Sequence, residues 1–141
     1  MISLRDILEG SGGVLRGNAH SDLLLRHVRH DSREVEPGDL FVAIVGERHD
    51  GHDFIPDALA RGAGAVMVDR QHAPSLEGLS VPVIVVDDTV AGLQRLASYW
   101  RSLFDVRVIG ITGSIGKTST KEAVASVASQ RYQVVRTRRS Y

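Results

Sequence analysis

The residues most able to do chemistry form one short run between an apolar stretch and a helical pattern, Gly113-Ser114-Ile115-Gly116-Lys117-Thr118-Ser119. Glycines in such a loop let backbone N–H groups turn toward a phosphate, and the N-terminus of the following helix supplies further donors. Lys117 would bring positive charge to the β- and γ-phosphates of ATP, and the Thr118 hydroxyl would join the ligands of Mg²⁺. The run therefore predicts an ATP-binding phosphate loop with Lys117 as its catalytic cation.

The glycine pattern of this loop is shorter than the general one. That pattern has a glycine five residues before Gly116, where this chain has Ile111. A plain strand-to-helix turn with a solvated lysine is therefore the alternative interpretation. The apolar run Val106–Ile111 before the loop and the helical spacing of Ala123, Val124, Val127 and Ala128 after it favour the phosphate loop.

A second group of polar residues falls where predicted strands end. Asp31-Ser32-Arg33 follows the apolar segment 24–28, and Gly46-Glu47-Arg48-His49 follows the apolar run Leu40–Val45. Open α/β sheets bind ligands outside the carboxyl ends of their strands. Ser32, Arg33 and the segment 46–49 are therefore candidates for a substrate site.

The residues after this segment raise the question of a metal site. His49, Asp50, His52 and Asp53 are residue types that bind metal ions. The alternative, which we favour, is an ordinary loop in which Asp53 caps the next helix.

Helices and strands alternate along the chain and would position both groups. Apolar runs bounded by turn residues predict strands at Val14–Leu15, Leu24–Val28, Leu40–Val45, Ala65–Val68, Val83–Val86 and Val106–Ile111. Capping residues and helical periodicity predict one helix after Ser3, with Asp6 completing a capping box, and a second that is capped by Asp53. A third would be capped at Asp88 or Thr89 and end near Phe104.

This order of elements predicts an α/β fold with a largely parallel sheet. A boundary near Asp105 would divide the chain into an N-terminal domain, residues 1–104, and the start of a second domain, residues 105–141. The second part would hold the first strand, phosphate loop, helix and strand of an ATP-binding domain.

The composition limits the class of protein. The 141 residues are 43% hydrophobic and 24% charged, and 17 basic residues balance 17 acidic ones, which disfavours a nucleic-acid-binding role. The arginines near the end, Arg131, Arg136, Arg138 and Arg139, are interpreted as a solvated strand end. The absence of cysteine excludes a disulfide framework and a cysteine nucleophile. Without a long apolar run or a signal peptide, we expect a cytoplasmic protein, taken to be monomeric, with no membrane insertion.

Several blocks of this sequence resemble the Mur ligase family. Those similar to the N-terminal domain of the family are Asp31-Ser32-Arg33, Pro37–Ala43, Gly46–Ile55 and Gly62–Val66. The segment Ile109–Thr118 resembles the ATP site of the family, whose loop has the same short glycine pattern. The resemblance extends over nearly all of the chain and is far more specific than the phosphate loop alone.

The resemblance implies an ATP-dependent ligase of peptidoglycan precursor synthesis. Its N-terminal domain would bind the UDP end of the substrate, its central domain ATP, and its C-terminal domain the incoming amino acid or dipeptide. ATP would phosphorylate the carboxylate that ends the substrate peptide, and the incoming amine would displace phosphate. By this resemblance Gly113, Ser114, Ile115, Gly116, Lys117, Thr118 and Ser119 would hold ATP with Mg²⁺ on Thr118, and Ser32, Arg33, Gly46, Glu47, Arg48 and His49 would contact UDP.

Within the family, Gly46–Arg48, His52–Phe54 and Ser119–Glu122 most resemble the member that adds D-alanyl-D-alanine to a UDP-N-acetylmuramoyl-tripeptide. The sister enzyme that adds the third peptide residue stays an alternative, although Lys121-Glu122 disfavours it. A non-catalytic nucleotide-sugar-binding module is the alternative of another class. We expect the chain to be the N-terminal portion of a longer ligase and inactive alone, because further metal ligands and the C-terminal domain would follow Tyr141.

Overall fold

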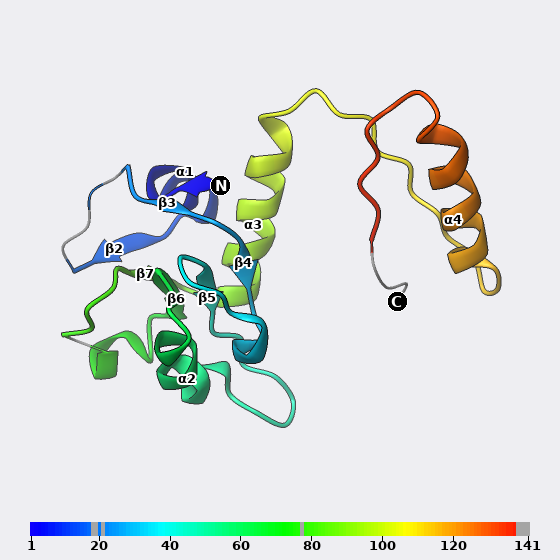
Figure 1. Cartoon of the computed structure of the whole chain (residues 1–141). Coiled ribbons are helices and arrows are strands. Elements are labelled where there is room, and N and C mark those ends of the chain that lie inside the picture. The colour runs from blue at the N-terminus through cyan, green and yellow to red at the C-terminus, as the bar shows by residue number, and fades with distance from the viewer. Residues whose placement is uncertain (18–19, 21, 77, 138–141) are drawn as a thin grey trace. The chain divides into compact units, whose positions relative to one another are not determined.

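The computed structural model describes residues 1–17, 20, 22–76 and 78–137 (Figure 1). The chain forms two compact units, Met1–Asp105 and Val106–Tyr141. The elements of the first, with 3₁₀ helices labelled η, are β1 (Ile2–Ser3), α1 (Leu4–Ser11), β2 (Val14–Arg16), β3 (Leu24–Leu25), β4 (Val28–Arg29), η1 (Ser32–Glu34), β5 (Leu40–Val42), η2 (Gly51–Phe54), α2 (Ile55–Ala60), β6 (Ala65–Asp69), η3 (Ala73–Leu76), β7 (Val83–Val86) and α3 (Thr89–Ser102); the second contains α4 (Lys117–Ala128). Among the residues described, none of the helices combines the length and the apolar character needed to cross a membrane.

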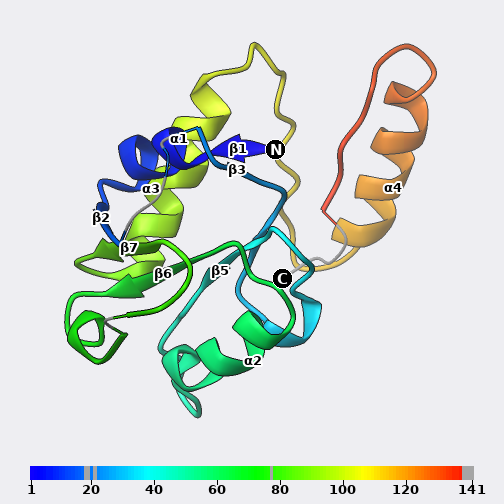
Figure 2. The ribbon, with the colours of Figure 1, turned by 60° about the vertical axis from the view of Figure 1, so that its left-hand side comes forward.

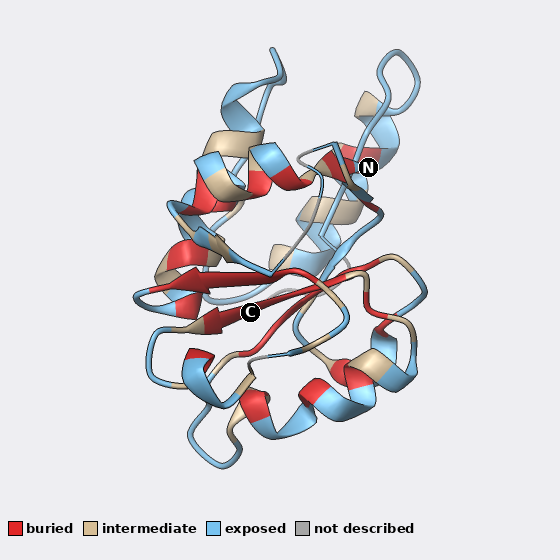
Figure 3. Ribbon diagram, turned by 90° about the vertical axis from the view of Figure 1, so that its left-hand side faces the viewer, coloured by how far each residue is buried: buried red, intermediate tan, exposed pale blue. Residues whose placement is uncertain are grey.

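A five-stranded sheet forms the centre of the first unit, in the order β2-β7-β6-β5-β4. Strands β4 to β7 run parallel, and β2 pairs antiparallel with β7. In the register of the central pair, Val66 lies opposite Val83 and Val68 opposite Val85. Strands β5, β6 and β7 are almost entirely buried (Figure 3), because both faces of the sheet are covered. The predicted α/β fold with a largely parallel sheet is thereby confirmed.

The two-residue period of the strands divides the core into two layers. On one face, strand residues pack against α1 and α3 in a cluster of Ile2, Leu4, Ile7, Leu25, Leu40, Val42, Ala65, Met67, Ile84, Val86 and Leu96. On the other face, they pack against α2 and η3 in a cluster of Val35, Phe41, Ala43, Ile55, Ala58, Ala63, Val66, Val68, Ala73, Val83 and Val85. Figure 2 shows α1 and α3 together on one side of the sheet and α2 on the other. The sheet is therefore the middle layer of three.

Side-chain caps set the starts of α1 and α3 as predicted. The Ser3 hydroxyl accepts a hydrogen bond from the backbone N–H of Asp6 at 3.1 Å. The Asp88 carboxylate accepts one from the N–H of Ala91 at 2.6 Å. Each bond satisfies a backbone donor that has no partner within its helix.

The predicted cap at Asp53 was wrong. Asp50 is the capping residue of this region, because its carboxylate accepts the backbone N–H of His52 at 2.9 Å and starts η2. The chain passes directly from η2 into α2, where the N–H of Ile55 already bonds to the His52 carbonyl oxygen. Pro56 then occupies the first turn and has no N–H to be capped. Asp53 therefore has no helix end to cap.

Four predicted strands also differ from those observed. The segment Leu24–Val28 is split into β3 and β4, which belong to different sheets, and β5 ends at Val42 rather than Val45. Of the strand–loop–helix–strand unit predicted after Asp105, the described residues show only the helix α4. A strand requires a neighbour with which it exchanges backbone hydrogen bonds, so apolar character alone does not create one.

Candidate functional site

The predicted phosphate loop leads directly into α4. Gly116, the residue before the helix, has φ of 81°, and Gly113 has φ of 149°, both in the region that favours glycine. The two glycines therefore meet a conformational need of the loop. The Lys117 ammonium donates to the Gly113 carbonyl oxygen at 2.7 Å and so lies across the loop.

The loop is open to solution. Residues 113–116, Thr118 and Ser119 are exposed, with Ile115 at 95%, and Lys117 is partly buried. A helix N-terminus, an ammonium group and exposed hydroxyls form a donor set that suits the negative oxygens of a phosphate chain. The residues present thus fit ATP, and their assignment to it stays a prediction.

Ser32 lies in the turn η1 at the carboxyl end of β4 and is buried. Its hydroxyl hydrogen-bonds the Asp57 carboxylate of α2, and this bond lowers the pKa of Asp57. Arg61, the residue that follows α2, donates to the Arg33 carbonyl oxygen at 3.4 Å. Helix α2 therefore fastens the turn, and Asp57 and Arg61 are positioning residues that no sequence motif indicated.

Arg33 presents its side chain to solution from the same turn, with 81% of it exposed. The guanidinium donates to both carboxylate oxygens of Asp31, from Nε at 2.9 Å and from Nη2 at 2.7 Å. These bonds lower the pKa of Asp31 to about 2, so the pair is ionised at neutral pH. A planar, exposed guanidinium at a strand end is suited to bind the oxygens of a diphosphate.

The segment Gly46–His49 forms an exposed loop after β5, which we call the 46–49 loop. Val45 and Asp50 pair as an antiparallel bridge at its base, and the N–H of Gly46 donates to the His49 carbonyl oxygen at 2.9 Å. Since β4 and β5 are parallel neighbours, this loop and the Ser32 turn lie at the same edge of the sheet. The structure thus brings the two predicted substrate segments to one edge.

Asp39 is a buried charge that the sequence patterns did not identify. Its carboxylate is 0% exposed and accepts the backbone N–H groups of His27 and Glu36, each at 3.1 Å, and Nε of Arg29 at 3.3 Å. Burial alone would raise the pKa of Asp39, but these hydrogen bonds outweigh it and hold the pKa below its usual value. Asp39 therefore ties β4 to the turn before β5. In the sequence, Asp39 follows Pro37-Gly38, and this pattern indicated only a turn.

Asp50, His52 and His72 place potential metal ligands within 4.8 Å of one another, at the ends of β5 and β6. The two imidazole rings are stacked, with centroids 3.8 Å apart and planes 13° apart, so their in-plane lone pairs run parallel instead of converging on one ion. Each ring nitrogen also faces a partner in Asp50 or Asp69. This geometry does not fit a shared metal ion, and we describe the group as a hydrogen-bond network.

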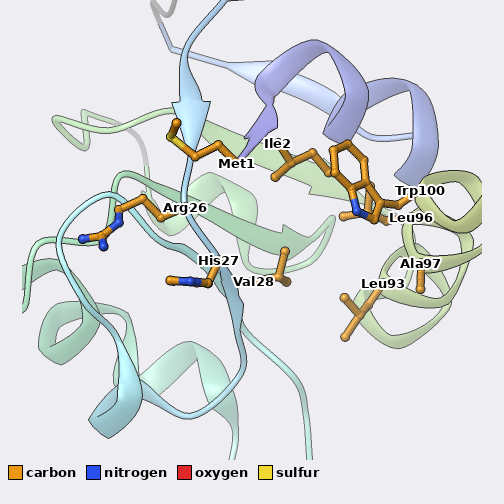
Figure 4. A pocket seen from close by; sticks show the side chains of 9 residues that line it. All are labelled: Met1, Ile2, Arg26, His27, Val28, Leu93, Leu96, Ala97 and Trp100. Carbon is orange, nitrogen blue, oxygen red and sulfur yellow. The ribbon is translucent and has the colours of Figure 1, made fainter. Parts of the chain in front are cut away.

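A pocket of about 290 Å³ lies between the N-terminus, strand β4 and helix α3 (Figure 4). Its lining is mostly apolar and includes Ile2, Val28, Leu93 and Trp100. The Arg26 guanidinium points away from these side chains in Figure 4. None of the residues predicted to do chemistry lines this pocket, so we do not assign it to the site.

Comparison with known proteins identifies the class of this chain. A family model described as Mur ligase family, catalytic domain, matches residues 25–101, which is more than half of the sequence. The chain therefore belongs to the Mur ligase family.

Two curated relatives bear on the reaction. The chain is 44% identical over 126 residues to the UDP-N-acetylmuramoyl-tripeptide–D-alanyl-D-alanine ligase of Synechocystis sp., which covers 88% of the chain and 27% of the relative. It is 42% identical over 113 residues to the UDP-N-acetylmuramoyl-L-alanyl-D-glutamate–2,6-diaminopimelate ligase of Pseudomonas putida, covering 79% of the chain and 23% of the relative. The chain thus spans about a quarter of the length of these relatives.

Solved structures show the same relationship. A crystal structure of MurF from Acinetobacter baumannii matches with a TM-score of 0.79 and 29% identity, over 92% of this chain and 27% of that one. The MurF ligase from Thermotoga maritima in complex with ADP matches with a TM-score of 0.64 and 38% identity, over 79% of this chain and 25% of that one.

Proposed function

We propose that this chain is the N-terminal part of an ATP-dependent ligase that adds D-alanyl-D-alanine to a UDP-N-acetylmuramoyl-tripeptide. The observation that carries the proposal is the 44% identity, over 88% of the chain, to a ligase whose name states this reaction. The reaction belongs to peptidoglycan precursor synthesis, and we place it in the cytoplasm.

ATP would bind on the loop before α4. Backbone N–H groups near Gly113 and Gly116 would bind phosphate oxygens, and Lys117 would exchange its bond with the Gly113 carbonyl for the β- and γ-phosphates. Mg²⁺, with Thr118 among its ligands, would supply further positive charge. The ADP complex of the similar ligase from Thermotoga maritima supports nucleotide binding.

The UDP end of the precursor would lie at the carboxyl edge of the sheet. Arg33 and Arg48 are exposed there and would donate to the diphosphate, with Gly46, Glu47 and His49 contributing from the same loop. Ser32 would act through the shape of its turn, since its hydroxyl bonds to Asp57. The D-alanyl-D-alanine substrate would be received by parts of the ligase beyond this chain.

The proposed function is tested by asking which of two pairs of substrates the complete ligase uses. With the complete ligase, D-alanyl-D-alanine and a tripeptide precursor should release ADP, whereas a single diamino acid and a dipeptide precursor should not. The reverse result would favour the sister enzyme, to which the 42% identity with the ligase of Pseudomonas putida also points. ADP release with neither pair would favour the non-catalytic nucleotide-sugar-binding module.

Replacing Arg33 by alanine should weaken binding of the UDP precursor about ten-fold, because a charge-assisted contact to the diphosphate is lost. Calorimetry on the 141-residue chain measures this. Arg5→Ala, which removes an exposed arginine from α1, is the matched control and should bind like the wild type. Equal affinities for the Arg33 and Arg5 variants would contradict the assigned role of Arg33.

A further inference from the structure

His72 lies between the carboxylates of two residues that are distant in the sequence. Its Nδ1 is 2.8 Å from Asp69 Oδ1, and its Nε2 is 3.3 Å from Asp50 Oδ2. Asp69 ends β6, and Asp50 follows β5 as the cap of η2. The imidazole of His72 therefore connects the ends of two neighbouring strands.

The stacked partner of this ring, His52, accepts a backbone hydrogen bond. The backbone N–H of Asp69 donates to His52 Nε2 at 3.3 Å, so this nitrogen is an acceptor. The ring proton then lies on Nδ1, which donates to Asp50 Oδ1 at 2.6 Å. His52 is buried, and both of its ring nitrogens have partners.

His72 differs from His52, because both of its ring nitrogens face carboxylate oxygens. A neutral ring would point one lone pair at a carboxylate, whereas an imidazolium donates to both. The hydrogen bond to Asp69 raises the pKa of His72 against a smaller opposing effect of burial, and the charges of Asp69, Asp50 and Asp53 raise it further.

The arginine next to Asp69 in the chain does not bind to this group. Arg70, which follows Asp69 in the chain, instead donates to Asp87 at 2.9 and 2.6 Å. Both carboxylates of the network, Asp50 and Asp69, have pKa values below the usual range and are ionised at neutral pH. One imidazolium between two carboxylates is therefore the stable arrangement.

Asp50 links this network to the 46–49 loop. It forms the bridge with Val45 that closes the loop, while its carboxylate accepts the backbone N–H of His52 at 2.9 Å. Next to it, the N–H of Gly51 donates to the Ile44 carbonyl oxygen at 2.9 Å. The position of Asp50 therefore determines the position of the loop.

We propose that the His72 imidazolium is a positioning residue, which clamps Asp50 to Asp69 and holds the 46–49 loop in the shape that receives the diphosphate of the UDP precursor. The inference rests on the proposed function, because that function gives the loop its ligand. A histidine with a raised native pKa stabilises this arrangement fully below its ordinary pKa of 6.5, and the stabilisation is lost as pH rises through the native value. The affinity for the UDP precursor should therefore fall as pH rises through the native pKa of His72.

Nuclear magnetic resonance of the 141-residue chain tests the clamp without any ligand. At about pH 6, the side-chain spectrum should show both nitrogens of His72 protonated. The backbone signals of residues 46–49 should shift between about pH 6 and about pH 9 with the midpoint of the His72 ring. Loop signals that do not follow this midpoint would overturn the proposal.

Two variants isolate the contribution of His72 to the position of the 46–49 loop. His72→Arg keeps a cation with several donors that stays charged, so it should retain loop position and precursor affinity at about pH 9. His72→Gln carries no charge and should bind about ten-fold more weakly than the wild type at about pH 6. His20→Gln removes an exposed histidine and is the matched control. If the affinity of the His72→Arg variant for the precursor falls with rising pH as much as that of the wild type, the clamp is contradicted.

The two proposals fail in different ways. If the wild-type chain binds no UDP precursor at any pH while the loop signals follow His72, the proposed function of this unit is wrong and the clamp is supported. If the precursor binds but neither the loop signals nor the affinity respond to His72, the clamp is wrong and the proposed function is supported.

Discussion

Replacing Lys117 by alanine in the complete ligase is expected to reduce ADP production at least about a hundred-fold, while affinity for the UDP precursor stays nearly unchanged. Phosphoryl transfer depends on positive charge placed against the transferred group, and we propose Lys117 as the cation that the phosphate loop supplies. The residues proposed for UDP belong to the other compact unit, Met1–Asp105, so the substitution leaves them intact. ADP release and precursor calorimetry measure the two effects separately.

Lys121→Ala is the control for this result. Lys121 stands one turn later on α4 and donates to the Thr137 carbonyl oxygen at 2.7 Å, outside the phosphate loop. Its loss should change ADP production little. The 141-residue chain itself should bind ATP weakly with Mg²⁺ and catalyse no ligation, because the proposed function assigns the incoming substrate to parts of the ligase outside this chain. Wild-type turnover by the Lys117 variant would refute the role given to the loop.

Replacing Gly51 by alanine is expected to lower the free energy of unfolding by about 3 kcal/mol. A Cβ at this position would lie 2.4 Å from the backbone nitrogen of Ile44 and 2.6 Å from its carbonyl oxygen. These are backbone atoms, so the clash cannot be relieved by rotation of a side chain. The segment before the 46–49 loop would have to move, and the bond from the Gly51 N–H to Ile44 would be lost.

Urea denaturation followed by the fluorescence of Trp100, the single tryptophan, measures this change. Gly110→Ala is the matched control, because a Cβ there meets no atom within 4 Å and the stability should change by less than about 0.5 kcal/mol. A Gly51 variant as stable as the Gly110 variant would show that the backbone around Ile44 yields more easily than the structure indicates.

The elements that were predicted well depend on local patterns. Ala65–Val68 and Val83–Val86 are continuous apolar runs, and they became β6 and β7 because strands covered on both faces need apolar residues at every position. Ser3 and Asp88 are capping residues beside periodic helices, and both accept the expected backbone bonds. Such features involve residues only a few positions apart, so residue type and spacing were sufficient to predict them.

The strand predicted at Val106–Ile111 shows the limit of this approach. Four of its six residues are valine or isoleucine, but a strand also requires a pairing partner, and none of the described residues of the second unit forms a strand. Similarly, the segment Leu24–Val28 by itself could not reveal that its two ends pair with different strands, β1 and β5. Pairing depends on where other segments of the chain lie.

The same reason explains which candidate residues the sequence could indicate and which it could not. Lys117, Arg33 and the 46–49 loop could be identified because each belongs to a short motif of consecutive residues. His72 and Asp50 are 22 positions apart, and only the parallel register of β5 and β6 brings their side chains within 3.3 Å. Short-range spacing therefore determines helices, buried strands and motifs, whereas contacts between strand ends arise only when the sheet has assembled and brought remote residues together.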